Sequence, residues 1–317
     1  MADFNDILKE IDKAISRFNK SIPNAQKKMY QELVVELKRL DLKGDKIKPT
    51  VGNLKIIQSI KNKLTRLILT DDYLEEVKEF VKSFNTVSKL QNEYWKGIES
   101  KFKPGPLLKE IRTQAIGDTV KQLTESGIAA NIGDAISDIL RTNITSGGSY
   151  KALNEQLLNS LTDTDKSDGM LTRYAKTITT DSINTYAAQY NQVVSNSLGF
   201  EWYAYRNSEI MTSRPFCQAM VENRRYFHVS EIPDLLAAKD LYYKDNKTGK
   251  TKKVTIYDKT GLPHGMKEGT NPANFLTLRG GWNCGHQITP VPERNVPLEV
   301  RDRVYNTPAY HAWKATQ

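Results

Sequence analysis

Cysteine is nearly absent from this sequence, because Cys217 and Cys284 are the only thiols in 317 residues. Two cysteines cannot form the multi-disulfide framework on which small secreted domains depend. No apolar run approaches the ~20 residues that cross a lipid bilayer, and the N-terminus lacks the basic start and apolar block of a secretory signal. We therefore expect no membrane association and a reducing cytoplasm, where free or metal-bound thiols are favoured over a disulfide.

Motifs of nucleotide chemistry are also missing. The sequence contains no G-x-x-x-x-G-K-[ST] phosphate loop, which argues against an ATP-driven motor. It has no E-x-E element near its end, of the kind that ADP-ribosyl-transferring domains carry. Acidic residues are outnumbered, with 37 Asp and Glu against 46 Lys and Arg, so the formal net charge is +9. This excess favours polyanionic neighbours such as DNA or acidic protein surfaces, although no single helix gathers the basic residues on one side.

Most of the chain has the periodicity of amphipathic helices. Residues 3–102 repeat apolar side chains every three or four positions, first up to Pro23, where we expect a break, and then in three further helices. Thr70 is a suitable N-cap for the last of these. The linker 103–106 contains two prolines and a glycine, and we predict a domain boundary there. A helical body follows over residues 105–199.

The pattern changes to short alternating segments after this body. Residues 200–293 combine short strands with long loops, which is typical of a small α+β module. Residues 294–317 contain two prolines and are predicted to form an extended tail. The predicted fold class is therefore mainly α, with an elongated helical arm over residues 1–104, the helical body, and a small C-terminal α+β module. Its short antiparallel strands are expected to be clipped together by Cys/His cassettes.

Thiol and imidazole groups cluster in this module. The first cassette is Thr212-Ser213-Arg214-Pro215-Phe216-Cys217, and the second is Gly280-Gly281-Trp282-Asn283-Cys284-Gly285-His286. Such side chains hold structural zinc, usually four around one ion. Cys217, Cys284 and His286 would supply three ligands, with His228 or alternatively His264 as the fourth, and in this interpretation zinc is the one candidate cofactor. A disulfide between the two cysteines and a pair of unbonded buried thiols are alternative interpretations.

These cassettes resemble the C-terminal signature of the phage head morphogenesis family, the Mu F-like minor head proteins. Members carry a T-x-R-x-x-C element after a tryptophan-bearing strand, then an aromatic-rich stretch, then a Gly-rich N-C-x-H element followed by proline. The matching positions, within residues 105–293, are Trp202, Thr212, Arg214, Cys217, Tyr226, Phe227, His228, Gly280, Gly281, Trp282, Asn283, Cys284, His286 and Pro290. Arg214 is expected to fix a loop through backbone carbonyls or Glu209, and Trp282 to pack over the clip.

The resemblance implies a structural virion protein rather than an enzyme. A minor head protein acts in procapsid assembly, DNA packaging or ejection. The implied partners are the portal protein, the major capsid protein or both, with nonspecific contact to packaged DNA. The implied location is the host cytoplasm during assembly and then the head or neck of the virion.

Two other functions fit parts of the sequence. A metal-dependent nuclease acting on phage or host DNA would need a base beside an open metal position, for which His264 with Glu268, or Asp258, are candidates. A nonspecific DNA-binding accessory protein of the virion would use the densest basic cluster. That cluster consists of Lys247, Lys250, Lys252 and Lys253. The Asn, Thr and Gly residues interleaved with it also predict an exposed hairpin turn.

Overall fold

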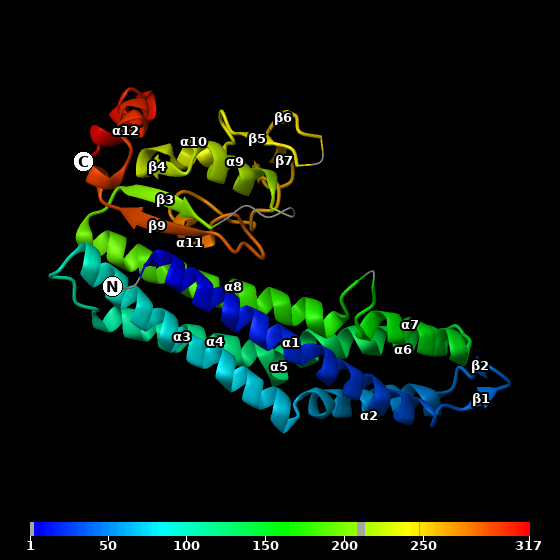
Figure 1. Ribbon diagram of the computed structural model, residues 1–317. Coiled ribbons are helices and arrows are strands. Elements are labelled where there is room, and N and C mark those ends of the chain that lie inside the picture. The colour runs from blue at the N-terminus through cyan, green and yellow to red at the C-terminus, as the bar shows by residue number, and fades with distance from the viewer. Residues whose placement is uncertain (1–2, 166, 208–212, 247) are drawn as a thin grey trace. The chain divides into compact units, whose positions relative to one another are not determined.

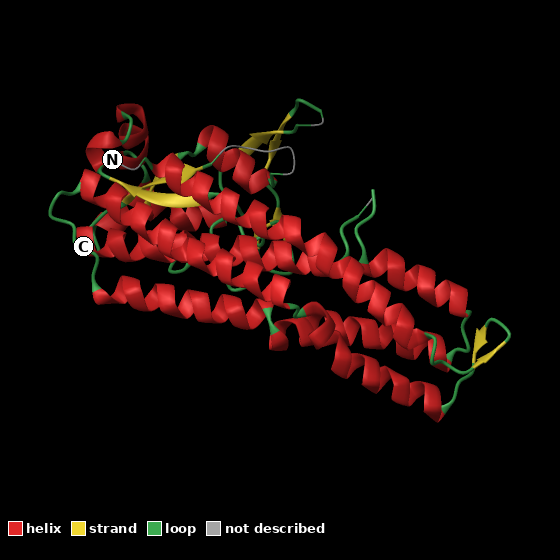
Figure 2. Ribbon diagram, turned by 60° about the horizontal axis from the view of Figure 1, so that its bottom comes forward, coloured by secondary structure: helices red, strands yellow, loops and turns green. Residues whose placement is uncertain are grey.

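The protein is mainly helical, with a few short antiparallel strands, as the sequence predicts. The computed structural model describes residues 3–165, 167–207, 213–246 and 248–317, and over these it contains thirteen α-helices and four small sheets. The strands form only a small part of the chain (Figure 1, Figure 2). Two compact units are present: a helical unit of Met1–Lys103 and Arg112–Thr179, and a C-terminal unit of Pro104–Ile111 and Thr180–Gln317.

The helical unit begins with three long helices. These are α1 (Phe4–Leu37), α2 (Val51–Ile68) and α3 (Asp71–Ile98), and a two-stranded hairpin of β1 (Leu42–Lys43) and β2 (Lys46–Ile47) joins the first two. Helix α1 packs against both α2 and α3. Thr70 caps α3 as predicted, because its hydroxyl accepts a hydrogen bond from the backbone N–H of Tyr73 at 3.3 Å. Phe18 packs against Tyr73 and Phe80 between α1 and α3.

The predicted helix break at Pro23 is wrong, because α1 continues through it. Proline inside a helix costs about 3 kcal/mol. The apolar stripe, however, keeps the same face on both sides of the proline, through Phe18, Ile22, Met29 and Leu33, all of which are buried. Burial of each large apolar side chain contributes about 1.5–3 kcal/mol, so the continuous stripe outweighs the lost hydrogen bond.

The middle of the chain forms shorter helices. These are α4 (Pro106–Leu123), α5 (Glu125–Ile128), a π-helical turn (Ala129–Gly133), α6 (Asp134–Thr145), α7 (Tyr150–Leu161) and α8 (Met170–Leu198). Helix α6 packs on α2, and α7 packs on α1 and α6. Buried Gln26 donates hydrogen bonds to Asp163 at 2.9 Å and to Thr172 at 2.8 Å. The predicted division between an arm (1–104) and a body (105–199) therefore differs from the structure, in which helices from both pack into one unit.

A three-stranded antiparallel sheet forms the centre of the C-terminal unit, in the order β4 (Tyr226–His228), β3 (Trp202–Arg206), β9 (Gln287–Val291). Side chains alternate between the two faces of a strand. Tyr203 and Tyr205 thus share one face with Phe227, and we call this the thiol face because both cysteines belong to the same apolar cluster. It packs against α9 (Pro215–Asn223), α10 (Ile232–Leu236) and α11 (Phe275–Leu278). Figure 1 shows α9 and α10 on one side of the sheet.

The opposite face of the sheet, here called the aromatic face, is covered by the C-terminal residues. Trp202, Ala204 and Val291 pack there with Val296 and Val304. The prediction of an extended tail is wrong, because the chain forms α12 (Leu298–Tyr305) and α13 (Pro308–Lys314). The two prolines stand immediately before α12 and at the first position of α13, where a missing N–H breaks no helical hydrogen bond.

Two small hairpins complete the C-terminal unit. One pairs β5 (Tyr242–Lys244) with β6 (Thr251–Lys253), and the other pairs β7 (Ile256–Tyr257) with β8 (Leu262–Pro263). None of the described helices combines the length and the apolar character needed to cross a bilayer.

Candidate metal centre

Arg214 joins the two cassettes. Its Nη1 donates a hydrogen bond to the carbonyl of Gly280 at 2.6 Å, and its Nη2 donates to the carbonyl of Trp282. Backbone carbonyls are one of the two kinds of partner expected for the Arg214 side chain. The other expected partner, Glu209, and the motif residue Thr212 lie outside the described residues. The guanidinium holds the second cassette against the start of α9 by two bonds that a lysine would not reproduce in this forked geometry.

Local backbone geometry places the thiols. Helix α9 begins at Pro215, a favourable first residue, and carries Cys217 into the apolar cluster of the thiol face. The second cassette turns sharply, with a φ of 99° at Gly281 and 52° at Asn283. A Cβ on Gly281 would lie 2.1 Å from the carbonyl oxygen of Gly265, so only glycine fits there. This turn directs Cys284 towards Cys217.

Cys217, Cys284 and His286 form a group that can hold a metal ion. Their ligand atoms all lie within 4.8 Å of one another, and all three side chains are buried. The Nδ1 atom of His286 is 3.8 Å from the Cys284 sulfur, and its Nε2 has no hydrogen-bond partner among the described residues. Both cysteines are free thiols, so the structure does not contain the disulfide that was one of the sequence-based interpretations. Two sulfurs and the Nδ1 atom of a buried imidazole, 3.8 Å from one of them, fit a thiophilic divalent ion.

Neither histidine proposed as the fourth ligand is part of this group. His228 pairs with Trp202 across the sheet, so its side chain points to the aromatic face, away from the thiols. Its Nδ1 accepts a hydrogen bond from the backbone N–H of Ser230 at 3.2 Å. His264 is exposed and packs edge-on against Tyr257, with ring centroids 5.4 Å apart. The one-position offset between Phe227 and His228 decides which of them faces the thiols.

Tyr205 is the residue of the site that sequence reasoning missed. Its hydroxyl donates to the Cys217 sulfur at 3.4 Å and lies 3.5 Å from the Cys284 sulfur. Its ring stacks on that of His286, with centroids 5.0 Å apart and planes inclined by 27°. Alternation along β3 places Tyr205 and Trp202 on different faces of the strand. This alternation was the signal in the sequence that could have pointed to Tyr205.

Hydrogen bonding and burial polarise the two thiols. The hydrogen bond from Cys217 lowers the pKa of the Cys284 thiol well below its usual range, with further contributions from the His286 hydrogen bond and the charge of Arg279. The same shared hydrogen bond, together with burial, raises the pKa of the Cys217 thiol. Burial also raises the pKa of Tyr205 well above its usual value. Cys284 is therefore the sulfur that most readily takes the thiolate form required for metal binding.

The outer side of the second cassette is fixed by charged residues. Asp181 accepts the backbone N–H of Asn283 at 2.8 Å and forms an ion pair with Lys267 at 3.1 Å. The Lys267 ammonium lies 4.2 Å from the centroid of the Trp282 ring. Trp282 is 54% exposed, so the expectation that it packs over the clip is not met, and its ring instead covers the lysine.

Arg279 is a buried cation beside the site. Only 1% of its surface is exposed, and its Nη1 donates to the carbonyls of Asn184 at 2.9 Å and Thr277 at 2.7 Å. Gln287 donates to the same Asn184, at its carbonyl and its side-chain oxygen. No carboxylate of the described residues lies within ion-pair distance of Arg279. Buried charges are normally compensated, so this guanidinium calls for a negative group nearby.

The other sequence-based candidates lie apart from the thiols. His264, Glu268 and Asp258 are all exposed and belong to no three-residue metal-binding group among the described residues. Of the basic cluster, Lys247 lies outside the described residues, while Lys250, Lys252 and Lys253 are exposed on the β5–β6 hairpin and its turn.

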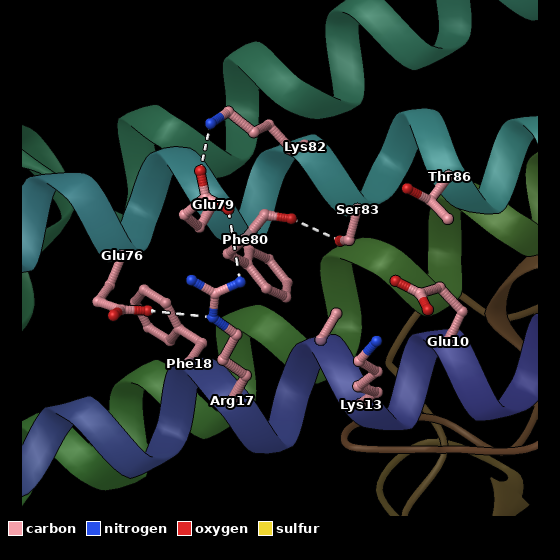
Figure 3. Close-up of a pocket in the computed structure, with 11 residues that line it drawn as sticks. Glu10, Lys13, Arg17, Phe18, Glu76, Glu79, Phe80, Lys82, Ser83 and Thr86 are labelled. Atoms are coloured by element: carbon pink, nitrogen blue, oxygen red, sulfur yellow. Dashed lines mark hydrogen bonds and ion pairs between the residues drawn. The ribbon is translucent and has the colours of Figure 1, made fainter.

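The helical unit has a surface groove of about 210 Å³ between α1 and α3 (Figure 3). Arg17 crosses it to reach Glu79 at 3.4 Å and Glu76 at 3.8 Å, between the rings of Phe18 and Phe80 in this view. Three acidic and three basic side chains line the groove. These opposite charges are balanced, and the ion pairs of Arg17 and Lys82 use several of them. We therefore attribute the groove to the packing of α1 against α3 and not to a binding site.

No match to this chain was found among protein-family models, curated proteins or solved structures.

Proposed function

We propose that this chain is a structural minor head protein of a bacteriophage, and that its C-terminal unit is closed by a zinc ion. The observation that carries the proposal is the convergence of the two cassettes on one buried centre, because these cassettes also carry the resemblance to the head morphogenesis family. Cys217 and Cys284 are separated by 66 intervening residues in sequence, yet their sulfurs contact the same tyrosine hydroxyl. An ion between them would tie the start of α9 to the second cassette.

The burial of the centre favours a structural role over catalysis. Cys217 and Cys284 are each 3% exposed and His286 is 6% exposed, so a nucleic-acid or peptide substrate has no direct access to the ligand atoms. Structural zinc sites are closed in this way, whereas catalytic sites keep a position open to water and substrate. Zinc supplies binding energy without redox chemistry, and such sites contribute on the order of 10 kcal/mol to folding. A closed clip is suited to a protein that must keep its shape inside an assembling particle.

The test is incorporation into particles. Procapsids are assembled with the portal and major capsid proteins of the phage that encodes the chain, and quantitative mass spectrometry gives the copy number of the chain in purified particles. We expect a few copies of the wild-type chain per particle and far fewer of Cys284→Ser. His264→Ala is the matched control, since this exposed imidazole is outside the metal group and should not affect incorporation. Particles that never retain the wild-type chain would overturn the virion assignment.

A second function, contact with packaged DNA, is favoured by the register of the β5–β6 hairpin. Tyr242 is opposite Lys253, and Lys244 is opposite Thr251, so these four side chains share one face, on which all are exposed. Lys252 is on the other face and forms an ion pair with Asp245 at 2.7 Å. The face with Tyr242 thus offers two lysines beside an exposed aromatic ring, the combination that binds nucleic-acid backbones and stacks on bases.

The DNA contact is tested by the salt dependence of binding. We expect the double variant Lys244→Ala, Lys253→Ala to weaken nonspecific DNA binding and to reduce the slope of log K against log salt by about 2. Lys252→Ala is the matched control, because that lysine is already neutralised by Asp245. Equal slopes for the double variant and the wild-type protein would exclude this face.

A further inference from the structure

Within the described part of the chain, the metal group has no fourth His, Cys, Asp or Glu ligand. Structural zinc takes four ligands in tetrahedral array. The described residues supply two thiols and one imidazole, and both remaining histidines considered for the site point elsewhere. A water molecule is an unsuitable fourth ligand in a closed structural site, so another buried side chain with a donor atom is required.

Tyr205 provides such an atom at the point where the sulfurs converge. Its hydroxyl oxygen lies 3.4 Å from the Cys217 sulfur and 3.5 Å from the Cys284 sulfur. These separations match the edge of about 3.5 Å between an oxygen and a sulfur ligand of tetrahedral zinc, given bonds of about 2.0 Å and 2.3 Å. A Cβ built on Gly280 would lie within 3.0 Å of all three donor atoms, so glycine at this position leaves them in place.

The fold holds Tyr205 rigidly at this point. It belongs to the central strand of the sheet, where it pairs with Ile288 on β9, and it is fully buried. Its ring also stacks on His286 and packs edge-on against Phe216. Ligands fixed by neighbouring packing bind an ion with little loss of conformational entropy.

The charge balance between the zinc centre and Arg279 favours a phenolate as the fourth ligand. Two thiolates and a neutral imidazole cancel the charge of a divalent zinc ion and leave buried Arg279 without a counter-charge. A phenolate as the fourth ligand gives the centre one negative charge, which compensates the guanidinium. Arg279 directly precedes Gly280 of the second cassette, and its hydrogen bonds go to the neutral backbone carbonyls of Asn184 and Thr277.

We infer that the Tyr205 phenolate is the fourth ligand of the zinc centre formed by Cys217, Cys284 and His286. This inference rests on the proposed zinc clip. On coordination, the zinc–oxygen bond replaces the phenol O–H bond, and the released proton passes to the buffer. In the metal-free protein the same hydroxyl donates its hydrogen bond to Cys217, so the phenol belongs to the site in both states.

The experiment titrates the full-length apo protein with zinc. We expect one zinc per chain, together with the near-ultraviolet difference absorption of tyrosinate. Tyr205→Phe should lose that band, release about one proton fewer per zinc, and bind zinc about 100-fold more weakly. Tyr203→Phe is the matched control, because that tyrosine lies on the same face of the same strand but its hydroxyl bonds Ser195 at 2.9 Å.

The outcomes separate the two proposals. If the wild-type protein binds no zinc, the clip and the tyrosine ligand both fail. If it binds one zinc without a tyrosinate band, the clip stands and the ligand assignment is overturned. This readout uses the wild-type protein, so it does not depend on whether Tyr205→Phe folds. Gly280→Ala gives a second check, since its Cβ would lie within 3.0 Å of both sulfurs and of the Tyr205 oxygen, and by displacing these donors it should abolish zinc binding.

Discussion

The two faces of the three-stranded sheet each bury a histidine, and the two histidines are satisfied differently. On the aromatic face, His228 lies against Trp202, Tyr310 and Trp313, and its Nδ1 accepts the N–H of Ser230. On the thiol face, His286 has one ring nitrogen 3.8 Å from a sulfur and the other without a partner among the described residues. The chain completes the aromatic face with its own side chains, whereas the thiol face brings together three side chains that can hold the proposed ion.

The largest expected effect is loss of the clip. Cys284→Ser removes one thiolate, and because metal binding contributes on the order of 10 kcal/mol, the C-terminal unit should lose most of its stability. Hydrogen exchange of the β3 amides measures this, with and without a chelator. We expect the chelator to accelerate exchange of the β3 amides in the wild-type protein and to have little effect on their exchange in the variant. Wild-type exchange that is indifferent to chelator would show that both faces are completed by side chains alone.

Trp202→Ala is the corresponding change on the aromatic face. Trp202 is buried against His228 and Tyr305, so removal of its ring should destabilise the C-terminal unit by about 3–5 kcal/mol. Denaturant unfolding measures the loss, and elemental analysis should still find one zinc per chain. Loss of zinc together with stability would mean that the two faces are not independent.

A smaller, pH-dependent effect distinguishes the two histidines. Burial lowers the pKa of His228 from 6.5 to about 4, partly opposed by the charge of Glu293. Between these values the unfolded chain binds a proton that the folded chain does not, so stability falls as the pH is lowered through this range, by up to about 3 kcal/mol. Protonation would also remove the acceptor that caps Ser230.

The pH effect is measured by denaturant unfolding of the zinc-loaded wild-type protein and of His228→Phe between pH 7 and pH 4. The thiol face responds to acid in both proteins, so the difference between the two profiles isolates His228. We expect a flatter profile for the variant. Parallel profiles would contradict a neutral His228 in the folded state.

The same comparison shows how far the sequence predicts the structure. The cassettes indicated correctly that Cys217, Cys284 and His286 come together and that Arg214 bonds backbone carbonyls, because these features are local or carried by a motif. The proposed fourth ligand, Tyr205, was missed for another reason: alternation separates it from Trp202, but the sequence does not show which face of β3 receives the cysteines. A shift of one position turns His228 to the thiol face and Phe227 away, and composition does not encode that parity.

The errors in the fold have a similar origin. Local preference alone led to a predicted helix break at Pro23 and to a predicted extended tail around the two prolines of residues 294–317. In the structure, the apolar stripe around Pro23 is buried on both sides, and the other prolines occupy helix starts that tolerate them. Burial against other helices keeps Pro23 inside α1, and a position at the start of a helix accommodates the other two prolines. Neither effect is visible in a local sequence window.

The smallest expected effect is that of replacing His264, the exposed histidine between the two cassettes, and it is measured against His286 of the second cassette. His264→Ala should change the free energy of unfolding by less than about 0.5 kcal/mol and leave the zinc content unchanged, because this imidazole is exposed and contacts only the edge of Tyr257 among ring partners. His286→Ala, by contrast, should release zinc and weaken the thiol face. Elemental analysis and unfolding of both variants under the same conditions provide the measurement. Equal zinc loss in the two would place His264 in the centre and require a rearranged loop between β8 and α11, whereas loss in His286→Ala alone leaves Tyr205 as the side chain positioned to complete the site.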